Sequence, residues 1–191
     1  MTATTLNQIR SNVFSSKPFI HAITNPISIN QCANAVLALG AQPIMAEHPE
    51  EVCEITKTAS ALLLNTGNIT DARTKSMLIS AETAHEKAIP FVVDAVGVAC
   101  SAFRRKYVMN LIENFSPSII KGNYSEITAL HNPTFKSVGV DAAAGLTISE
   151  SEYAAVHLAQ KYKTVVLASG KVDIVTDGKK VVRISNGTHR L

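Results

Sequence analysis

The sequence predicts an α/β fold in which helices on both faces cover a mostly parallel sheet that ends in an antiparallel hairpin. Short β-branched runs alternate with longer segments of helical periodicity along most of the chain, as in parallel strands joined by right-handed helical crossovers. Near the end, Asp177-Gly178 separates two further β-branched runs, which is a strong hairpin signal. A length of 191 residues suits one domain, so we expect residues 1–191 to form a single α/β domain.

Helices and strands alternate regularly in the first part of the chain. Apolar residues recur at helical spacing from Leu6 to Val13, and Pro18 follows the end of that helix. Gly40 is a typical stop for the second helix, and residues 48–51 combine a proline with acidic residues, as helix starts do. The elements expected here are a helix at 5–16, a strand at 19–23, a helix at 30–39, a strand at 43–46, a helix from 48 and a strand at 61–65.

Capping and turn residues mark the boundaries in the second part of the chain. Thr70 is a predicted N-cap, and residues 149–152 predict a capping box. Ser118 to Ile127 predicts a strand, a sharp turn at Gly122 and a helix capped by Asn123. The other elements expected are helices at 70–87, 102–115 and up to 162, and strands at 91–93, 164–168, 172–176 and 181–185.

Composition narrows the possible partners and the cell compartment. Aromatic residues make up 5% of the chain and Trp is absent, so few side chains could stack on bases. The net charge is +3, and the Lys and Arg residues are dispersed along the chain, so we expect no nucleic-acid partner. No apolar run is long enough for a membrane span. The start lacks signal-peptide features and three cysteines form no close pair, which predicts a cytoplasmic protein without structural zinc. Cys32 and Cys53 lie in predicted helices, where we expect buried thiols.

Two acidic residues follow consecutive strands of the predicted sheet. Asp94 ends the strand at 91–93, and Glu126 follows the Lys121-Gly122-Asn123 segment. If these strands are neighbours, both carboxylates face one crevice, where hard oxygen ligands suit Mg²⁺ bridging to substrate phosphates. Lys121 and the N–H groups of the helix start add positive charge, so the pattern predicts nucleotide phosphoryl chemistry. The alternative is an ordinary capped turn with solvated charges.

Other common catalytic motifs are absent. The chain has no Gly-x-Gly-x-x-Gly after its first strand and no Walker-type Gly-Lys-Ser/Thr, which argues against a nicotinamide enzyme and a P-loop ATPase. It also lacks a Gly-x-Ser-x-Gly nucleophile elbow, which argues against an α/β-hydrolase.

Five segments resemble the hydroxyethylthiazole kinase family, in the same order and over nearly the whole chain. The segments are Phe19 to Asn25, Leu37 to Ala46, Asp94 to Val98, Lys121 to Glu126 and Ser169 to Asp173. Asn123-x-x-Glu126 also resembles an element shared by ribokinase-like kinases. The resemblance implies a ribokinase-like fold and ATP-dependent phosphorylation of 4-methyl-5-(2-hydroxyethyl)thiazole with Mg²⁺, a salvage step towards thiamine, in a homotrimer.

The resemblance also implies roles for individual residues. By matching motifs, the resemblance implies that Asn25 and Met45 contact the thiazole and that Asp94 and Glu126 bind Mg²⁺. It implies ATP contacts for Lys121, Asn123 and Ser169. Lys121 stands where many relatives have Arg, which keeps the charge and loses the planar fork.

The resemblance further predicts that the catalytic cysteine is not in this chain. The family continues after Asn186-Gly187 into a Gly-x-Gly-Cys segment that forms an anion hole, whereas this sequence stops at Leu191. We therefore expect a ribokinase-like domain that is incomplete at its C-terminus. Two alternatives are a non-catalytic thiazole- or nucleotide-binding protein and another ribokinase-like kinase of a small alcohol.

Overall fold

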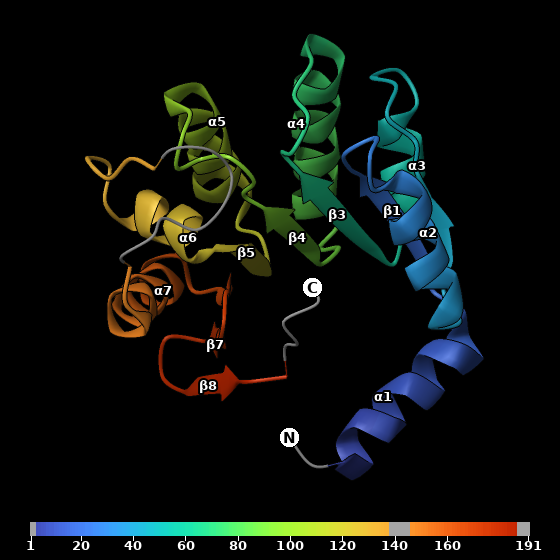
Figure 1. The fold of residues 1–191 in the computed structure, drawn as a ribbon. Helices are drawn as coiled ribbons and strands as arrows, with labels where there is room; N and C mark the ends of the chain where they lie inside the picture. Colours follow the sequence, from blue (N-terminus) through green and yellow to red (C-terminus); the bar gives the residue numbers. More distant parts are fainter. Residues whose placement is uncertain (1–2, 138–145, 187–191) are drawn as a thin grey trace. The chain divides into compact units, whose positions relative to one another are not determined.

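The computed structural model describes residues 3–137 and 146–186, and its chain divides into two compact units. Unit 1 comprises Met1–Phe91 and unit 2 comprises Val92–Leu191. Each unit is a layer of strands with helices packed on it, and each is described by itself below (Figure 1). Residues 187–191, where the resemblance places the approach to the Gly-x-Gly-Cys segment, lie outside the described residues.

Unit 1 contains a short parallel sheet with β1 in the middle. Its order is β2-β1-β3, with Phe19 opposite Gln42 on one side and Ile20 opposite Ala61 on the other. The predicted alternation is confirmed, because the elements are α1 (Ala3–Ser16), β1 (Phe19–Ile23), α2 (Ile29–Ala38), β2 (Gln42–Ile44), α3 (Val52–Thr58), β3 (Ala61–Asn65) and α4 (Asp71–Glu86).

The core of unit 1 lies between the sheet and α4. Ile23, Leu62, Leu64 and Met77 are almost completely buried, as expected for apolar strand residues facing a helix. Thr70 caps α4 as predicted, since its hydroxyl accepts the Arg73 N–H at 3.2 Å.

The first two helices contribute no fully buried residue. Neither α1 nor α2 has one, and Cys32 in α2 is only half-buried, as is Cys53 in α3, so the expectation of buried thiols is wrong. Gly40 ends α2 as predicted with φ +86°, and a Cβ there would lie 2.8 Å from Cδ2 of Phe14. Glycine is therefore favoured at position 40 for two reasons: the backbone is left-handed there, and α1 approaches too closely for a side chain.

Unit 2 holds the remaining strands in the order β4-β5-β6-β7-β8. The pairs β4/β5 and β5/β6 are parallel, and β6/β7 and β7/β8 are antiparallel, so the predicted C-terminal hairpin is confirmed. In chain order the elements are β4 (Phe91–Asp94), α5 (Ala102–Phe115), β5 (Ile119–Asn123), α6 (Tyr124–His131), α7 (Ile148–Tyr162), β6 (Val165–Ser169), β7 (Asp173–Thr176) and β8 (Val181–Ile184).

Two local predictions in unit 2 are wrong. Gly122 makes no sharp turn, because β5 runs through it to Asn123. The capping box of α7 lies two positions before the expected one: Thr147 is the N-cap and pairs with Glu150. Thr147 and Glu150 have the Thr-x-x-Glu spacing that the box requires, and Ser149 lies inside the first turn.

One further observation concerns membranes. Among the helices of residues 3–137 and 146–186, none has the length and apolar character required to cross a bilayer.

Candidate functional site

The parallel register of unit 2 brings the predicted nucleotide-side residues to one edge of the sheet. Asp94 in β4 lies opposite Lys121 in β5, and Asn123 in β5 lies opposite Ser169 in β6. These positions are at or near the carboxyl ends of three neighbouring parallel strands, where α/β sheets bind ligands. The strands that bear Asp94 and Lys121 are thus neighbours, which is the condition under which both acids would face one crevice.

Asp94 and Lys121 form an ion pair at this edge. The Lys121 ammonium lies 3.0 Å from Oδ1 and 3.2 Å from Oδ2 of Asp94, and the two side chains are 34% and 15% exposed. A pair that is partly open to water contributes little to stability. The ammonium can reach an incoming anion without crossing a packed core.

Glu126 connects two loops through its two carboxylate oxygens. One oxygen accepts the Asn123 N–H at 2.7 Å and completes a capping box with Asn123, whose side chain accepts the Glu126 N–H at 2.9 Å. The other oxygen accepts the Gly97 N–H at 2.7 Å, in the loop that follows β4. Glu126 therefore fixes the β4–α5 loop against the start of α6.

Burial sets the electrostatics of Glu126. The residue is 3% exposed, and its burial raises the pKa of the carboxyl, partly offset by the two backbone N–H donors. The negative charge of Asp94 also raises this pKa, and the charge of Lys121 lowers it. A Cβ at Gly122 would lie 2.9 Å from the Glu126 Cβ, so glycine is needed here for close packing rather than for a turn.

Ser169 completes the nucleotide-side group. It ends β6, and its hydroxyl donates to the Gly122 carbonyl at 3.3 Å. The hydroxyl thus lies beside the strand that carries Lys121 and Asn123. Five of the seven predicted site residues therefore lie in unit 2.

The donor set at this edge suits Mg²⁺ better than zinc. Asp94 and Glu126 supply hard carboxylate oxygens, and Mg²⁺ commonly takes one or two carboxylates and completes its shell with water and phosphate oxygens. Within the described part of the chain, no three His, Cys, Asp or Glu side chains gather as a metal cage would need. Asp94 and Glu126 are therefore residues that could hold Mg²⁺.

The two predicted thiazole contacts belong to unit 1. Asn25 follows β1, and its side-chain oxygen accepts the Ile27 N–H at 3.0 Å. Met45 follows β2, directly after Ile44, which lies opposite His21 of β1. Asn25 and Met45 thus follow the carboxyl ends of neighbouring parallel strands. A Cβ at Gly67 would lie 3.0 Å from the Asn25 amide nitrogen, so a second loop passes close to Asn25.

Three polar side chains that the sequence did not single out hold the segment after Met45. The completely buried His21 contacts the Ala46 carbonyl through Nε2 at 2.9 Å, and Arg73 binds the Glu47 carboxylate through Nε at 2.8 Å. The Ser76 hydroxyl donates to the Glu47 carbonyl at 2.8 Å. A histidine inside an apolar strand was the available signal, because a buried polar group needs a partner.

The tautomer of His21 follows from its partners. Nε2 must carry a proton because the Ala46 carbonyl only accepts, and in the neutral ring Nδ1 then accepts from the Thr56 hydroxyl at 2.9 Å. Burial lowers the pKa of His21, which favours this neutral form.

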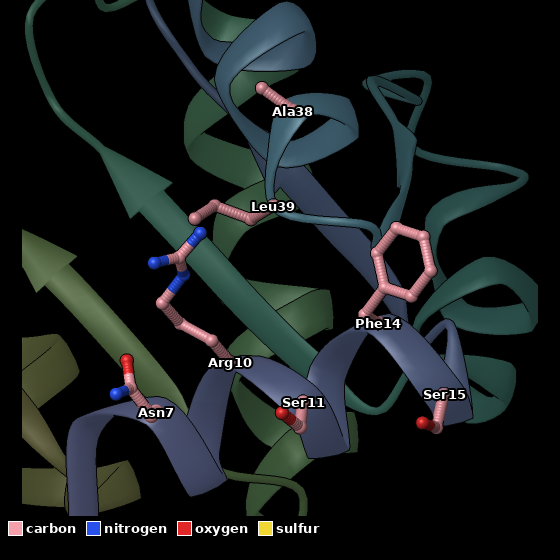
Figure 2. Close-up of a pocket in the computed structure, with 7 residues that line it drawn as sticks. All are labelled: Asn7, Arg10, Ser11, Phe14, Ser15, Ala38 and Leu39. Atoms are coloured by element: carbon pink, nitrogen blue, oxygen red, sulfur yellow. The ribbon is translucent and has the colours of Figure 1, made fainter. Parts of the chain in front are cut away.

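A pocket whose lining includes none of these residues lies between α1 and the C-terminal end of α2 (Figure 2). It has a volume of about 440 Å³. The described residues that line it are Asn7, Arg10, Ser11, Phe14, Ser15, Ala38 and Leu39. This lining contains one charged side chain and no carboxylate, so it offers no acid–base pair and no metal site.

Comparison with known proteins shows the family to which the chain belongs. The sequence matches the hydroxyethylthiazole kinase family over residues 10–191. It is 48% identical over 189 residues to hydroxyethylthiazole kinase 2 of Clostridium botulinum strain Langeland, covering 96% of this chain and 71% of that protein. It is 43% identical to hydroxyethylthiazole kinase of Alkaliphilus metalliredigens, covering 95% of this chain and 66% of that protein.

The solved structures agree with this assignment. The structure of hydroxyethylthiazole kinase from Pyrococcus horikoshii OT3 matches with a TM-score of 0.86 at 31% identity, over 97% of this chain and 68% of that one. Adenosine kinase from Schistosoma mansoni matches with a TM-score of 0.55 at 17% identity, over 94% of this chain and 64% of that one, which shows the ribokinase-like fold alone. Sequence and structure together place this chain in the hydroxyethylthiazole kinase family.

Proposed function

We propose that this protein transfers a phosphoryl group from ATP to the hydroxyl of 4-methyl-5-(2-hydroxyethyl)thiazole, as a salvage step towards thiamine. The observation that carries the proposal is the group of Asp94, Lys121, Asn123 and Glu126 at the carboxyl edge of β4 and β5, in a member of this kinase family. The group combines a cation, two acids and a helix N-terminus beside each other, as nucleotide phosphates require.

Lys121, Asn123 and Ser169 are proposed to bind ATP. Phosphoryl transfer depends mainly on positioning and charge stabilisation, and the Lys121 ammonium supplies positive charge for phosphate oxygens. The Asp94 carboxylate holds the ammonium at 3.0 Å and so orients it at this edge of the sheet. Ser169 adds a hydroxyl donor, and the start of α6 adds backbone N–H groups after Asn123.

Asp94 and Glu126 are proposed to organise Mg²⁺. Asp94 would contribute a carboxylate directly, and Glu126, whose oxygens already accept two backbone N–H groups, would bind through water. The ion would neutralise charge on the phosphates. If Lys121 pairs with a phosphate, the Asp94 carboxylate would be available to hold the magnesium ion.

Asn25 and Met45 are proposed to contact the thiazole. The Asn25 amide offers both a donor and an acceptor to a polar ring substituent, and the Met45 thioether packs well against a sulfur heteroaromatic ring. Deprotonation of the acceptor hydroxyl is assigned to none of the described residues.

The assembly and compartment are also proposals. A homotrimer is supported by apolar side chains that α1 and α2 leave in solvent, namely Leu6 and Phe14 on α1 and Leu37 on α2, with Leu39 just after α2. The mass of the particle in solution, measured by light scattering, tests it. The odd cysteine count favours the cytoplasm.

Competing alcohols in one assay test the reaction. ADP release is measured with Mg-ATP and either the thiazole alcohol or a pyrimidine alcohol as acceptor. Faster release with the thiazole alcohol supports the proposal, whereas preference for the pyrimidine alcohol would favour a different small-alcohol kinase. Binding of ATP and thiazole without any turnover would instead indicate a non-catalytic binding protein.

A further inference from the structure

Tyr124 connects the start of α6 to the turn between β6 and β7. It is the first residue of α6, directly after Asn123, and is 6% exposed. Its hydroxyl donates to the Val172 carbonyl, 48 residues further along the chain. The bond joins the element that carries Asn123 and Glu126 to the turn that begins at Ser169.

The ring of Tyr124 lies directly against Gly170 in the same turn. A Cβ at Gly170 would be 2.6 to 2.8 Å from three carbons of the ring, a distance that no side chain tolerates. Gly170 has no positive φ, unlike Gly40, Gly97 and Gly178, so glycine is required here by the approach of the ring and not by the backbone conformation.

Other bonds of the turn are local or lead back to β5. The Gly170 N–H donates to the Asp173 carboxylate at 3.1 Å, and the Ser169 hydroxyl donates to the Gly122 carbonyl at 3.3 Å. Gly170 and Lys171 are exposed, so little apolar burial holds the turn. The ring of Tyr124 lies against Gly170 and its hydroxyl bonds to the Val172 carbonyl, so both parts of the side chain contact the turn.

We propose that Tyr124 is a positioning residue for the nucleotide, which holds the Ser169–Asp173 turn in its ATP-binding conformation through its ring and its hydroxyl. The proposal rests on the proposed function, because Ser169 is an assigned ATP contact there. The β5/β6 pairing holds Ser169 itself beside Asn123, and Tyr124 holds the residues that follow Ser169, so that ATP does not have to order the turn on binding.

The first test removes the hydroxyl alone. In Tyr124→Phe the ring remains, and we expect the dissociation constant for ATP to rise about 3- to 10-fold, the range for one hydrogen bond of ordinary net strength. Thiazole affinity should not change. Tyr162→Phe is the matched control, because its hydroxyl contacts Glu113 at 3.3 Å on the exposed surface of unit 2, away from the turn.

Limited trypsin digestion reports the turn without any nucleotide. Cleavage after the exposed Lys171 requires local opening, so Tyr124→Phe should be cut there several-fold faster than the unaltered protein, and Tyr162→Phe should not. Bound ATP should slow this cleavage in the unaltered protein.

A double substitution tests the ring contact. Gly170→Ala should weaken ATP binding strongly in the unaltered background and much less when Tyr124→Ala removes the ring that the new methyl would meet. Equal losses in both backgrounds would overturn the ring contact as the cause.

The outcomes separate this proposal from the proposed function. If the unaltered protein binds ATP and Tyr124→Phe binds it equally well, the positioning role is overturned while the kinase assignment stands. If the unaltered protein binds no ATP, the result contradicts the proposed kinase function, and with it the positioning role that rests on that function. If Tyr124→Phe weakens ATP binding and speeds cleavage after Lys171, the results support the positioning role of Tyr124 and show that it acts by holding the Ser169–Asp173 turn.

Discussion

Replacing Glu126 with Gln tests whether this carboxylate holds the two loops of the site together. The substitution keeps the shape of the side chain but replaces one oxygen with an NH₂ group, which cannot accept a hydrogen bond. One of the two backbone N–H groups, that of Gly97 or that of Asn123, therefore loses its acceptor in a site that is 3% exposed. Leaving a buried donor unsatisfied costs about 1–3 kcal/mol.

The assay is denaturation of the unaltered and substituted proteins. For a chain of this size, each kcal/mol lowers the melting temperature by about 2–4 °C. Glu150→Gln is the control, because Glu150 makes the same kind of capping box on α7 and lies on the surface, where water replaces a lost acceptor. We expect a clearly smaller loss in the control. Equal losses would contradict the reasoning, since burial is what separates the two sites.

The pH dependence of this loss follows from the raised pKa of Glu126. An acid whose pKa is higher in the folded protein than its ordinary value of 4.5 releases its proton less readily when folded. Its burial penalty is therefore absent below about 4.5 and grows as pH rises through the folded pKa. Gln does not titrate, so the stability of the unaltered protein relative to Glu126→Gln should fall as pH rises above 4.5. A relative stability that rises instead would mean that the backbone N–H donors outweigh burial.

Three further predictions concern unit 1. Arg73→Met should destabilise the protein by about 1–3 kcal/mol and weaken thiazole binding, because buried Arg73 holds Glu47, which follows Met45 by two residues. The control is Arg183→Met in unit 2, which removes an exposed ion pair to Glu152 and should change the free energy of unfolding little. Gly40→Ala should cost about 1–3 kcal/mol in chemical denaturation, because φ is +86° and the new methyl meets Phe14; full stability would show that α1 moves aside freely. Phe14→Glu should lower the particle mass seen by light scattering if α1 lies in the trimer interface, and an unchanged trimer would exclude α1 from it.

Local chemistry allowed most element boundaries to be predicted. Thr70 and Asn123 were predicted as N-caps, since a side-chain oxygen before a helix satisfies an unpaired N–H. Alternation and turn residues also predicted the parallel strands and the hairpin around Asp177-Gly178. Gly122 was misinterpreted because glycine permits both a turn and close packing, and only the position of the Glu126 side chain decides between them.

Only the site residues at the ends of parallel strands could be located from the sequence. Asp94 and Lys121 could be placed side by side because consecutive parallel strands end at the same edge. The bond from Glu126 to Gly97 could not be predicted, since it joins residues 29 positions apart through the path of a loop. The same holds for Tyr124 with Val172 and for Arg73 with Glu47, which depend on tertiary packing with no local sequence signature.

The affinity of the protein for ATP after removal of the Lys121 charge tests the nucleotide site most directly. Isothermal titration of Mg-ATP into Lys121→Ala should give a dissociation constant about 10- to 100-fold above that of the unaltered protein, the range for a lost charge-assisted bond. Lys75→Ala, which removes an exposed lysine on α4, is the matched control and should bind ATP normally. Equal affinity of the unaltered and Lys121→Ala proteins would contradict the assignment of this edge of the sheet to the nucleotide.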